Sequence, residues 1–419
     1  MSGQRARHLD RRTMLRASAA GGASVVLSGA AGAPWSSAAD ATMTRVYVLV
    51  VDGCRPDEID ATLTPRMHEL RRTGLWYPQA RSVPIMETLP NHAMMMTGVR
   101  PDRNGVPANS IYDRDEGVVR DLDRATDLAY PTVLERLRSK GFTTGTVLSK
   151  DYLYGLFGER ATYRWEPEPL LPVTEHALDV FTHSALVSMV RDADPHLVFA
   201  NFGDIDRFGH GDLTGGSLKL LRRLALAGTD RLIGSFVDHL KDAGTWRHSV
   251  VIVLADHAMD WSDPYRVISL NESFKDDPLL ADNVVFADNG GADVMYWTGP
   301  SAQRDEAIRR MRQRASGVPG VLSLHDPEEL RLGERGGDLV AYCQAGWRFS
   351  DPDLLANPIP GNHGHPATAP IPFFVAGGSP LVRRGTSSAR ARTIDVAPTV
   401  GEVFGLERPG GGYDGHSRL

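Results

Sequence analysis

Runs of apolar and β-branched residues recur along the chain, and segments with helical periodicity lie between them. The clearest run, Val46 to Val51, is apolar at every position, as expected for a strand that is buried on both faces of a sheet. Further strands are predicted at Thr143 to Leu148, Leu197 to Phe202, Val250 to Leu254, Val294 to Trp297 and Phe373 to Ala376. Helical patterns occur at Thr64 to Arg72, Thr132 to Lys140, Ala177 to Arg191, Leu218 to Ala243 and Arg304 to Arg314. Since strands that alternate with helices pair in parallel, the pattern predicts an α/β fold with a mostly parallel central sheet and helices on both faces.

Two longer segments interrupt this alternation. Residues 260–291 are polar and resemble loops, and residues 317–352 resemble a small irregular insertion. We expect these insertions to form a cap and to supply the walls of a substrate cleft. The chain from residue 44 to residue 419 shows no repeats and is predicted to be one domain.

The first part of the chain, residues 1–41, differs in composition from the rest. The adjacent pair Arg11 and Arg12 precedes a weakly apolar stretch, rich in Ala, Gly and Ser, and small residues follow it as at a signal-peptidase site. Residues 1–41 are therefore predicted to be a cleaved export signal of the twin-arginine type, and the protein to be secreted or located in the cell envelope or periplasm. A disordered basic tail and a membrane anchor are the alternatives, although Gly and Ser interrupt the apolar stretch too often for a typical spanning helix.

Composition narrows the class of protein. Charged residues make up 23% of the chain and hydrophobic residues 42%, as in a soluble globular protein. The net charge of -6 predicts no basic surface for nucleic acid, so the expected partner is a small molecule. Cys54 and Cys343 are the only cysteines, which excludes a disulfide framework and leaves either one bridge or two packed thiols.

Side chains of the kind that bind metals follow several predicted strands. In open α/β sheets, ligands gather just beyond the carboxyl ends of the strands. Asp52, Asp256 and His257 each follow a strand directly, Asp206 and His210 follow the strand that ends near Phe202, and His363 precedes the strand that begins at Phe373. Each position alone is explained equally well by a helix cap, a turn or a surface pair. Their joint occurrence at one edge of a sheet favours a metal site.

Thr88 is the candidate nucleophile. Pro90 suits the first turn of a helix, so Thr88 is expected at or near a helix N-terminus, where phosphate oxygens are favoured. A threonine hydroxyl becomes a nucleophile at neutral pH only when a metal or a base ionises it. A purely structural N-cap is the alternative for Thr88.

These motifs together resemble the alkaline phosphatase superfamily, and within it the nucleotide pyrophosphatase/phosphodiesterase branch. The stretches that carry the resemblance are Val51-Asp52-Gly53, Thr88 to His92 with Thr97-Gly98, Asn109 to Asp113, Asp206 to His210, Asp256-His257, His363-Gly364 and Thr393 to Thr399. They span nearly the whole chain after the predicted signal.

The resemblance implies two zinc ions per chain and a role for each matching residue. Asp206, His210 and His363 would hold one ion, and Asp52, Asp256 and His257 would hold the other, which the oxygen of Thr88 would also reach. Asn109 would direct its amide at a phosphoryl oxygen, and hydrolysis would pass through phospho-threonine. Manganese or iron would also suit these ligands. Asp204 and His365 lie close to the assigned ligands but fit the motifs less well.

The predicted substrate is a phosphodiester or a pyrophosphate, with three alternatives. Family members often carry lysine before the nucleophile and an aromatic residue after it, where this chain has Glu87 and Leu89. A phosphomonoesterase and a phosphonate hydrolase of the phosphonoacetate type are the enzymatic alternatives; the latter use lysines near the substrate, and none is found in the sequence around Asn109. Sulfatases require Cys-x-Pro-x-Arg, which the segment from Cys54 to Glu58 does not provide. The third alternative is an exported protein that binds metal or phosphate without catalysis.

Overall fold

The central sheet runs through the middle of the molecule. The computed structural model describes residues 7–8, 43–171, 175–211 and 220–419, so Arg11, Arg12 and most of the predicted export signal lie outside the described residues. Within the described part, nine strands form this sheet: in spatial order β1 (Arg7–His8), β7 (Tyr163–Trp165), β6 (Thr144–Leu148), β8 (Leu197–Phe202), β2 (Arg45–Val51), β9 (Ser249–Leu254), β18 (Phe373–Ala376), β3 (Leu75–Trp76) and β19 (Gly385–Thr386). Five of the six predicted strands lie in it, within one residue of the predicted bounds.

The strand β18 runs opposite to both of its neighbours in the sheet, and this matters for the site. The strands from β1 to β9 all pair in parallel, whereas β18 pairs antiparallel with β9 and with β3. The residues that precede β18 therefore lie at the same edge as the residues that follow β9, since Phe373 pairs with Leu254. This reversal explains how a histidine ahead of a strand can join side chains that follow strands.

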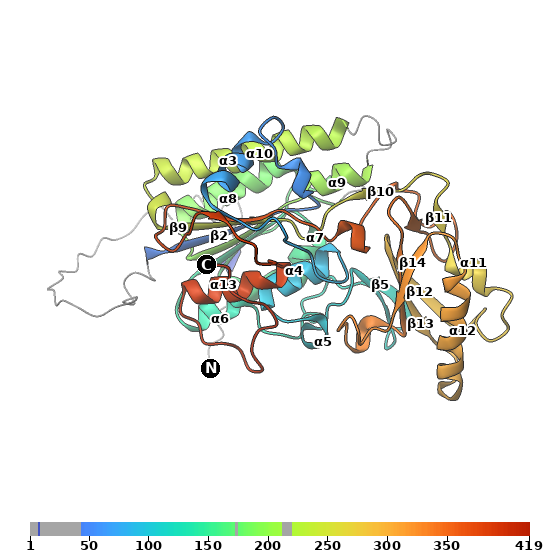
Figure 1. The fold of residues 1–419 in the computed structure, drawn as a ribbon. Coiled ribbons are helices and arrows are strands. Elements are labelled where there is room, and N and C mark those ends of the chain that lie inside the picture. Colours follow the sequence, from blue (N-terminus) through green and yellow to red (C-terminus); the bar gives the residue numbers. More distant parts are fainter. Residues whose placement is uncertain (1–6, 9–42, 172–174, 212–219) are drawn as a thin grey trace.

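Helices cover both faces of the sheet, as predicted (Figure 1). The helices α3 (Pro65–Thr73), α8 (Asp179–Ala193) and α10 (Leu220–Asp242) lie above it in this view, and α4 (Thr88–Thr97), α6 (Val133–Ser139) and α13 (Val396–Val403) lie below it. The residues of β2 from Val46 to Val51 are fully buried between these layers. An unbroken apolar strand is the pattern expected where both faces of a sheet are covered.

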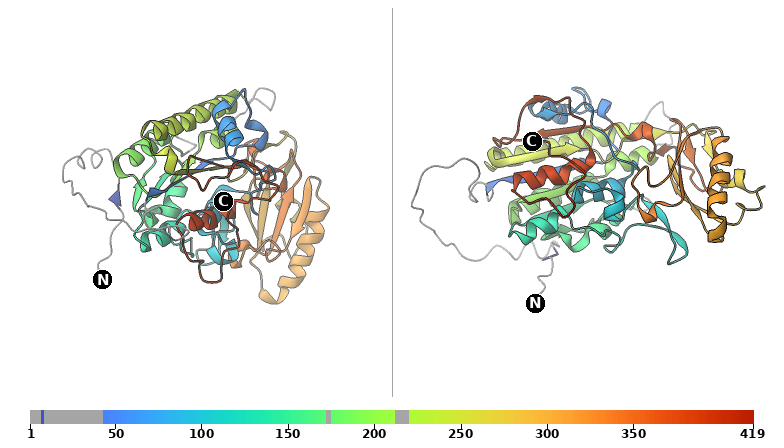
Figure 2. Two further views of the ribbon diagram at one scale, coloured as in Figure 1. Left: turned by 60° about the vertical axis from the view of Figure 1, so that its left-hand side comes forward. Right: turned by 60° about the horizontal axis from the view of Figure 1, so that its bottom comes forward.

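The two insertions form a second, smaller sheet beside the first (Figures 1 and 2). Its strands are β12 (Val284–Asn289), β13 (Ala292–Trp297), β15 (Leu339–Cys343) and β14 (Val321–His325), all antiparallel. The predicted strand Val294 to Trp297 thus belongs to this sheet and not to the central one. The segments predicted to be loop-like and irregular were wrong in part, because they contribute β12, β14 and β15. The helix α12 (Arg304–Ser316) packs on this sheet through Ala307 and Met311, which form a separate apolar core with Trp297.

The remaining elements are short. They are α5 (Pro101–Asn104), β4 (Ser110–Asp113), β5 (Val118–Asp121), α7 (Asp151–Phe157), α9 (Asp204–Gly211), β10 (Asp260–Trp261), β11 (Val267–Ile268), α11 (Leu270–Phe274), β16 (Arg348–Phe349) and β17 (Gly361–Asn362). Cys54 and Cys343 are both free and buried, which agrees with the reading of two packed thiols. No helix in the described ranges combines the length and the apolar character that a membrane span requires.

Candidate metal centre

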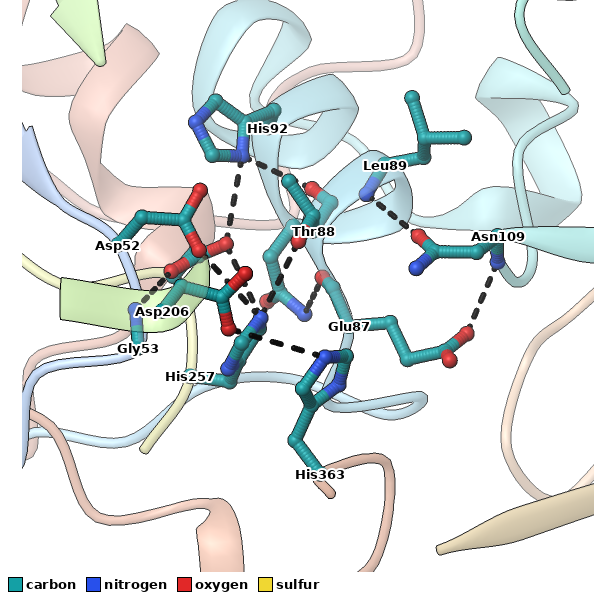
Figure 3. Close-up of polar contacts among 12 residues, drawn as sticks. Asp52, Gly53, Glu87, Thr88, Leu89, His92, Asn109, Asp206, His257 and His363 are labelled. Atoms are coloured by element: carbon teal, nitrogen blue, oxygen red, sulfur yellow. Dashed lines mark hydrogen bonds and ion pairs between the residues drawn. The ribbon is translucent and has the colours of Figure 1, made fainter. Parts of the chain in front are cut away.

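Six side chains predicted to bind metals lie together beyond the carboxyl ends of the parallel strands. They form two groups, and within each group the ligand atoms lie within 4.8 Å of one another. The first group is Asp206, His210 and His363, and the second is Asp52, Asp256 and His257. Figure 3 shows Asp52, Asp206, His257 and His363, members of both groups, around Thr88.

The turn after β2 brings the two groups together. Asp52 follows β2 directly, and the backbone N–H of Gly53 donates to Oδ1 of Asp256 at 3.1 Å. Gly53 has a φ of +70°, and a Cβ added there would lie 3.0 Å from the Cβ of Asp206. Only glycine combines this backbone conformation with so close an approach, so the turn keeps Asp52, Asp206 and Asp256 side by side.

The first group combines one turn of a helix with a loop. Asp206 and His210 lie four residues apart on α9, and Nε2 of His210 lies 3.3 Å from Oδ1 of Asp206. His363 reaches the same oxygen from the loop before β18, at 4.0 Å. Nδ1 of His210 hydrogen-bonds to the carbonyl of Gly361 at 2.7 Å. A histidine that donates through one ring nitrogen keeps the other free for a metal.

The second group is assembled in the same way after β9. Nε2 of His257 lies 3.3 Å from Oδ2 of Asp256 and 3.7 Å from Oδ1 of Asp52. Its Nδ1 lies 3.0 Å from the carbonyl of Ala258, which leaves Nε2 available as a ligand. The ring of His257 stacks on that of His363 with centroids 3.7 Å apart, so the two groups adjoin.

The carboxylate oxygens that face these groups fit a cation. Oδ1 of Asp52, Oδ1 of Asp206 and Oδ2 of Asp256 are buried and have no hydrogen-bond partner in the described part of the chain. Buried polar atoms are nearly always paired, and an ion is one of the few explanations for such an exception. Carboxylates and imidazoles, with no thiolate, suit zinc and also manganese or iron. The donor set therefore fits a metal in each group.

Burial controls the charge of the two central histidines. It lowers the pKa of His257 to about 4 and, together with the neighbouring imidazoles, the pKa of His363 well below its ordinary value. Both rings are therefore neutral near pH 7. A metal ligand must be neutral imidazole, so this is the protonation state that binding requires.

Thr88 is the first residue of α4 and lies against the second group. The N-cap of α4 is Glu87, so Thr88 is not the cap. Its Oγ1 lies 3.2 Å from Nε2 of His257. The dipole at this N-terminal end of α4 favours an anion next to the hydroxyl. The hydroxyl thus faces the candidate metal ligands and not the backbone of its own helix.

Asn109 lies on the other side of the same helix start. Its Oδ1 accepts a hydrogen bond from the backbone N–H of Leu89 at 2.8 Å. Its own backbone N–H donates to the buried carboxyl of Glu87 at 2.8 Å. Burial raises the pKa of Glu87 well above its ordinary value. These two bonds fix Asn109 beside Thr88 and leave its side-chain NH₂ for another partner.

Lys150 enters the centre from the segment after β6, a position that the sequence analysis missed. Its Nζ lies 2.8 Å from Oδ2 of Asp52, 2.7 Å from Oδ2 of Asp206 and 3.5 Å from Oγ1 of Thr88. Burial lowers the pKa of Lys150, but the Asp206 and Asp52 carboxylates more than offset this and raise it. The sequence around Asn109 has no lysine, and Lys150 reaches the site from a different segment of the chain.

Asn201 and His92 form a buried layer behind the ligands. The amide of Asn201 donates to Oδ2 of Asp52 at 2.8 Å and lies 3.1 Å from Nε2 of His92. Nδ1 of His92 lies 2.8 Å from the carbonyl of Thr88. Hydrogen bonds of this kind orient metal ligands. Asn201 lies inside β8 and not after it, so a search of strand ends cannot find it.

The two neighbouring candidates have other partners. Oδ1 of Asp204 lies 3.0 Å from Nε2 of His176. Nε2 of His365 lies 3.0 Å from Oδ2 of Asp260. Neither Asp204 nor His365 belongs to a candidate metal group among the described residues, which agrees with the choice of Asp206 and His363 from the motif spacing.

A cavity of about 450 Å³ opens in front of the centre. It is lined by Thr88 and Asn109, by side chains of the first metal group, and by residues 288–290 of the first insertion. The first insertion thus supplies a wall of the cleft, as expected. Residues 317–352 do not line this cavity, so the expectation for the second insertion was wrong; they pair behind the wall as β14 and β15.

Comparison with known proteins identifies the family. Residues 46–366 match the family described as type I phosphodiesterase / nucleotide pyrophosphatase. The chain belongs to this family. It is accordingly a hydrolase of the phosphodiesterase and nucleotide pyrophosphatase type within the alkaline phosphatase superfamily, as the motifs predicted.

Several relatives of this phosphodiesterase cover most of its length. A bis(5'-adenosyl)-triphosphatase of Bos taurus is 22% identical over 406 residues, covering 91% of this chain and 83% of its own. Ectonucleotide pyrophosphatase/phosphodiesterase family member 5 of Homo sapiens is 23% identical over 381 residues, covering 86% and 74%. The structure of the murine family member 5 has a TM-score of 0.70 at 20% identity, covering 87% of this chain and 95% of that one. A phosphonoacetate hydrolase of Sinorhizobium meliloti 1021, in complex with phosphonoformate, has a TM-score of 0.67 at 20% identity, covering 86% and 95%.

Proposed function

We propose that this phosphodiesterase hydrolyses phosphodiester or pyrophosphate bonds with two metal ions, most simply zinc, and with Thr88 as its nucleophile. The observation that carries the proposal is the place of the Thr88 hydroxyl, 3.2 Å from Nε2 of His257 and at the start of α4, beside two groups of carboxylates and imidazoles that could each hold a metal ion. Bound metal would polarise the phosphoryl group and favour the ionised hydroxyl. Asp206, His210 and His363 would hold one ion, and Asp52, Asp256 and His257 the other.

The reaction divides into two displacements at phosphorus. The hydroxyl of Thr88 gives up its proton to solvent as Oγ1 attacks, a new P–O bond forms to Thr88, and the bond to the leaving oxygen breaks, so that the leaving group departs and takes up a proton from solvent. Water then attacks the phospho-threonine, the P–Oγ1 bond breaks, and Thr88 regains its proton as the product leaves. The NH₂ of Asn109 donates to a phosphoryl oxygen throughout, since its Oδ1 is held by the N–H of Leu89.

The relatives support the class of substrate. The name of the bis(5'-adenosyl)-triphosphatase implies that this relative hydrolyses a pyrophosphate linkage. A threonine-to-alanine variant of the murine family member 5, in complex with AMP, is described as inactive. An alanine that inactivates that relative supports a threonine nucleophile here. Leu89 follows Thr88 at the position where family members often carry an aromatic residue, and a leucine offers no aromatic ring on which a nucleotide base could stack.

We also propose that the protein acts outside the cytoplasm. Several of the relatives, among them family members 5 and 1 of Homo sapiens, are named as ectonucleotide pyrophosphatases. The pair Arg11 and Arg12, with the apolar stretch that follows, supports export of the folded protein by the twin-arginine route. Replacement of both arginines by lysine should keep the protein in the cytoplasm of a host with that route. Export of the double variant at the wild-type level would contradict the proposed route and leave the catalytic proposal unaffected.

Turnover of bis-p-nitrophenyl phosphate by the purified protein tests the catalytic proposal. The protein loaded with zinc should release p-nitrophenol, 1,10-phenanthroline should abolish the reaction, and added zinc should restore it. Full activity in protein shown by elemental analysis to be free of metal would contradict the mechanism. Restoration by manganese alone would keep the mechanism and correct the metal.

A further inference from the structure

Among the residues that the structure describes, Arg207 is the one lysine or arginine that lines the cavity in front of the centre. It lies on α9, the helix that also supplies Asp206 and His210. Several carboxyl side chains, such as those of Glu175 and Asp288, line the cavity as well. A substrate that enters the cavity therefore meets a single guanidinium group among carboxyl groups.

The guanidinium group of Arg207 has no polar partner in the described part of the chain. Its Nε is buried and donates no hydrogen bond, and no hydrogen bond or ion pair links its other nitrogen atoms to the described residues. Buried polar atoms are nearly always paired, so an exception in the wall of a cavity points to a missing ligand. Since arginine stays protonated in proteins, this ligand is an anion or another acceptor at any working pH.

The ring of Tyr152 orients this guanidinium group. Tyr152 lies on α7 and lines the same cavity. The Cζ of Arg207 lies over its ring, 5.4 Å from the centroid. The face of an aromatic ring attracts a cation, and a guanidinium group that lies on it keeps its N–H groups free at the edge. The ring therefore restricts the movement of Arg207 without taking up its hydrogen-bond donors.

The donors of Arg207 suit a particular kind of ligand. Their planar arrangement matches the paired oxygens of a carboxylate or a phosphoryl group. The phosphoryl group that Thr88 attacks would have Asn109 and the two metal groups as its partners. The cavity of about 450 Å³ has the size of a small-molecule site and exceeds what one phosphoryl group fills. Arg207 is therefore available for an anionic group elsewhere in the same substrate.

We propose that Arg207 determines specificity by binding a second anionic group of the substrate, a carboxylate or a further phosphoryl group beyond the one that Thr88 attacks. The inference rests on the proposed function, because it takes Thr88 as the nucleophile of the same cleft. It narrows the substrate from phosphate esters in general to those that carry a second anion near the scissile bond. Esters without such an anion gain nothing from Arg207.

A merely structural role for Arg207 makes a different forecast. If its charge only stabilises the neighbouring carboxylate of Asp206, removal of the charge lowers the metal content or weakens the binding of every ligand by the same factor. If Arg207 binds a second anion, its removal weakens only those ligands that carry one. The two roles are therefore separated by a ratio of affinities together with the metal content.

The experiment compares wild type with Arg207→Gln, which removes the charge and keeps a polar side chain. Calorimetry on the zinc-loaded proteins measures the Kd of three phosphonates of similar length: 3-phosphonopropionate, ethane-1,2-diphosphonate and the neutral-ended 3-phosphonopropionamide. We expect wild type to bind the carboxylate or the diphosphonate about 10-fold or more tightly than the amide, as for one charge-assisted contact. Arg207→Gln should lose this preference at unchanged zinc content. Arg223→Gln, at an exposed position of α10, should keep it.

Each outcome decides the inference. A preference shown only by the carboxylate, or only by the diphosphonate, supports it and identifies the second anion. Equal affinities of wild type for all three ligands would overturn it without any variant, and so would a preference that persists in Arg207→Gln. An equal weakening of all three ligands, or a loss of zinc at unchanged preference, would overturn it in favour of the structural role. Wild type that binds with the expected preference but does not turn over bis-p-nitrophenyl phosphate would support the anion site and contradict the proposed function.

Discussion

The side-chain oxygen of Asn109 accepts the backbone N–H of Leu89 at 2.8 Å, across the first turn of α4. Because a backbone N–H can only donate, this bond determines which way the amide of Asn109 faces. The NH₂ group is turned away from the helix backbone, in the cleft that Thr88 also lines. A neutral donor is thus held next to Thr88, the proposed nucleophile.

Replacing this donor by an acceptor should impair catalysis without unfolding the protein. In Asn109→Asp the oxygen that binds Leu89 remains, but the NH₂ becomes a negatively charged oxygen. We expect kcat for bis-p-nitrophenyl phosphate to fall by about 10² to 10³, as when one donor to a developing oxyanion is lost. Asn271→Asp, the same change in the cap helix α11, should keep wild-type turnover. A kcat for Asn109→Asp within about twofold of wild type would remove Asn109 from the reaction.

Metal content should depend separately on the two ligand groups. His210→Ala removes one ligand of the first group, and Asp256→Ala removes one of the second. Since a site with two protein ligands holds zinc weakly, dialysed samples of each variant should contain about one zinc ion per chain where wild type contains about two. His325→Ala, in strand β14, provides the control. Wild-type zinc in both dialysed variants would argue against these residues as ligands.

The carboxyl of Asp288, in the wall of the cleft, should make the stability of the protein depend on pH. Burial raises the pKa of Asp288, in β12, from 3.8 to about 8. The folded state therefore holds this proton more tightly than the unfolded state, so the contribution of Asp288 to stability is fully present below about pH 4 and is lost as the pH rises to about 8. Asp288→Asn removes the ionisation, and its melting temperature should fall less between pH 5 and pH 9 than that of wild type. The control is Asp353→Asn, at an exposed position, whose melting temperature should depend on pH as that of wild type does. If the melting temperature of Asp288→Asn fell as much as that of wild type between pH 5 and pH 9, the carboxyl of Asp288 would not titrate as the structure indicates.

The sequence predicted the central sheet well because its inner strands are buried on both faces. In β2 the residues from Val46 to Val51 are all buried, as is every residue of β8, and nearly all of these residues are apolar, with Asn201 of β8 the polar exception. The ligands followed from the same reasoning, since Asp52 and Asp256 extend such runs. His363 joins them because β18 is antiparallel, a direction that the strand pattern alone does not reveal.

The second sheet was harder to predict because its strands are short and mixed in character. β12 contains Asp288 and Asn289 and is only partly buried, so its apolar pattern is weak. The dipeptide Asn289-Gly290 was the available sequence signal for a hairpin between β12 and β13. In the structure Gly290 has a φ of +66°, as such a turn requires. A pattern of turn residues would have found this hairpin where periodicity did not.

Lys150 shows what the search of strand ends left out. It stands two residues after β6, in the same relation to its strand as Asp256 has to β9. The search selected side chains that bind metals, and a lysine is not one of them. Only the fold shows that the segments holding Lys150, Asp52 and Asp206 meet, since β6 and β2 both pair with β8.

The turnover of Thr88→Ala tests the central claim most directly. In zinc-loaded protein that melts within a few degrees of wild type, we expect kcat for bis-p-nitrophenyl phosphate to fall by about three orders of magnitude or more, since the attacking atom is lost. Thr88→Ser should retain measurable turnover because the hydroxyl remains. A purely structural role for Thr88 would instead lower the melting temperature and leave kcat unchanged. A folded, zinc-loaded Thr88→Ala with near-wild-type kcat would contradict the nucleophile and, with it, the mechanism.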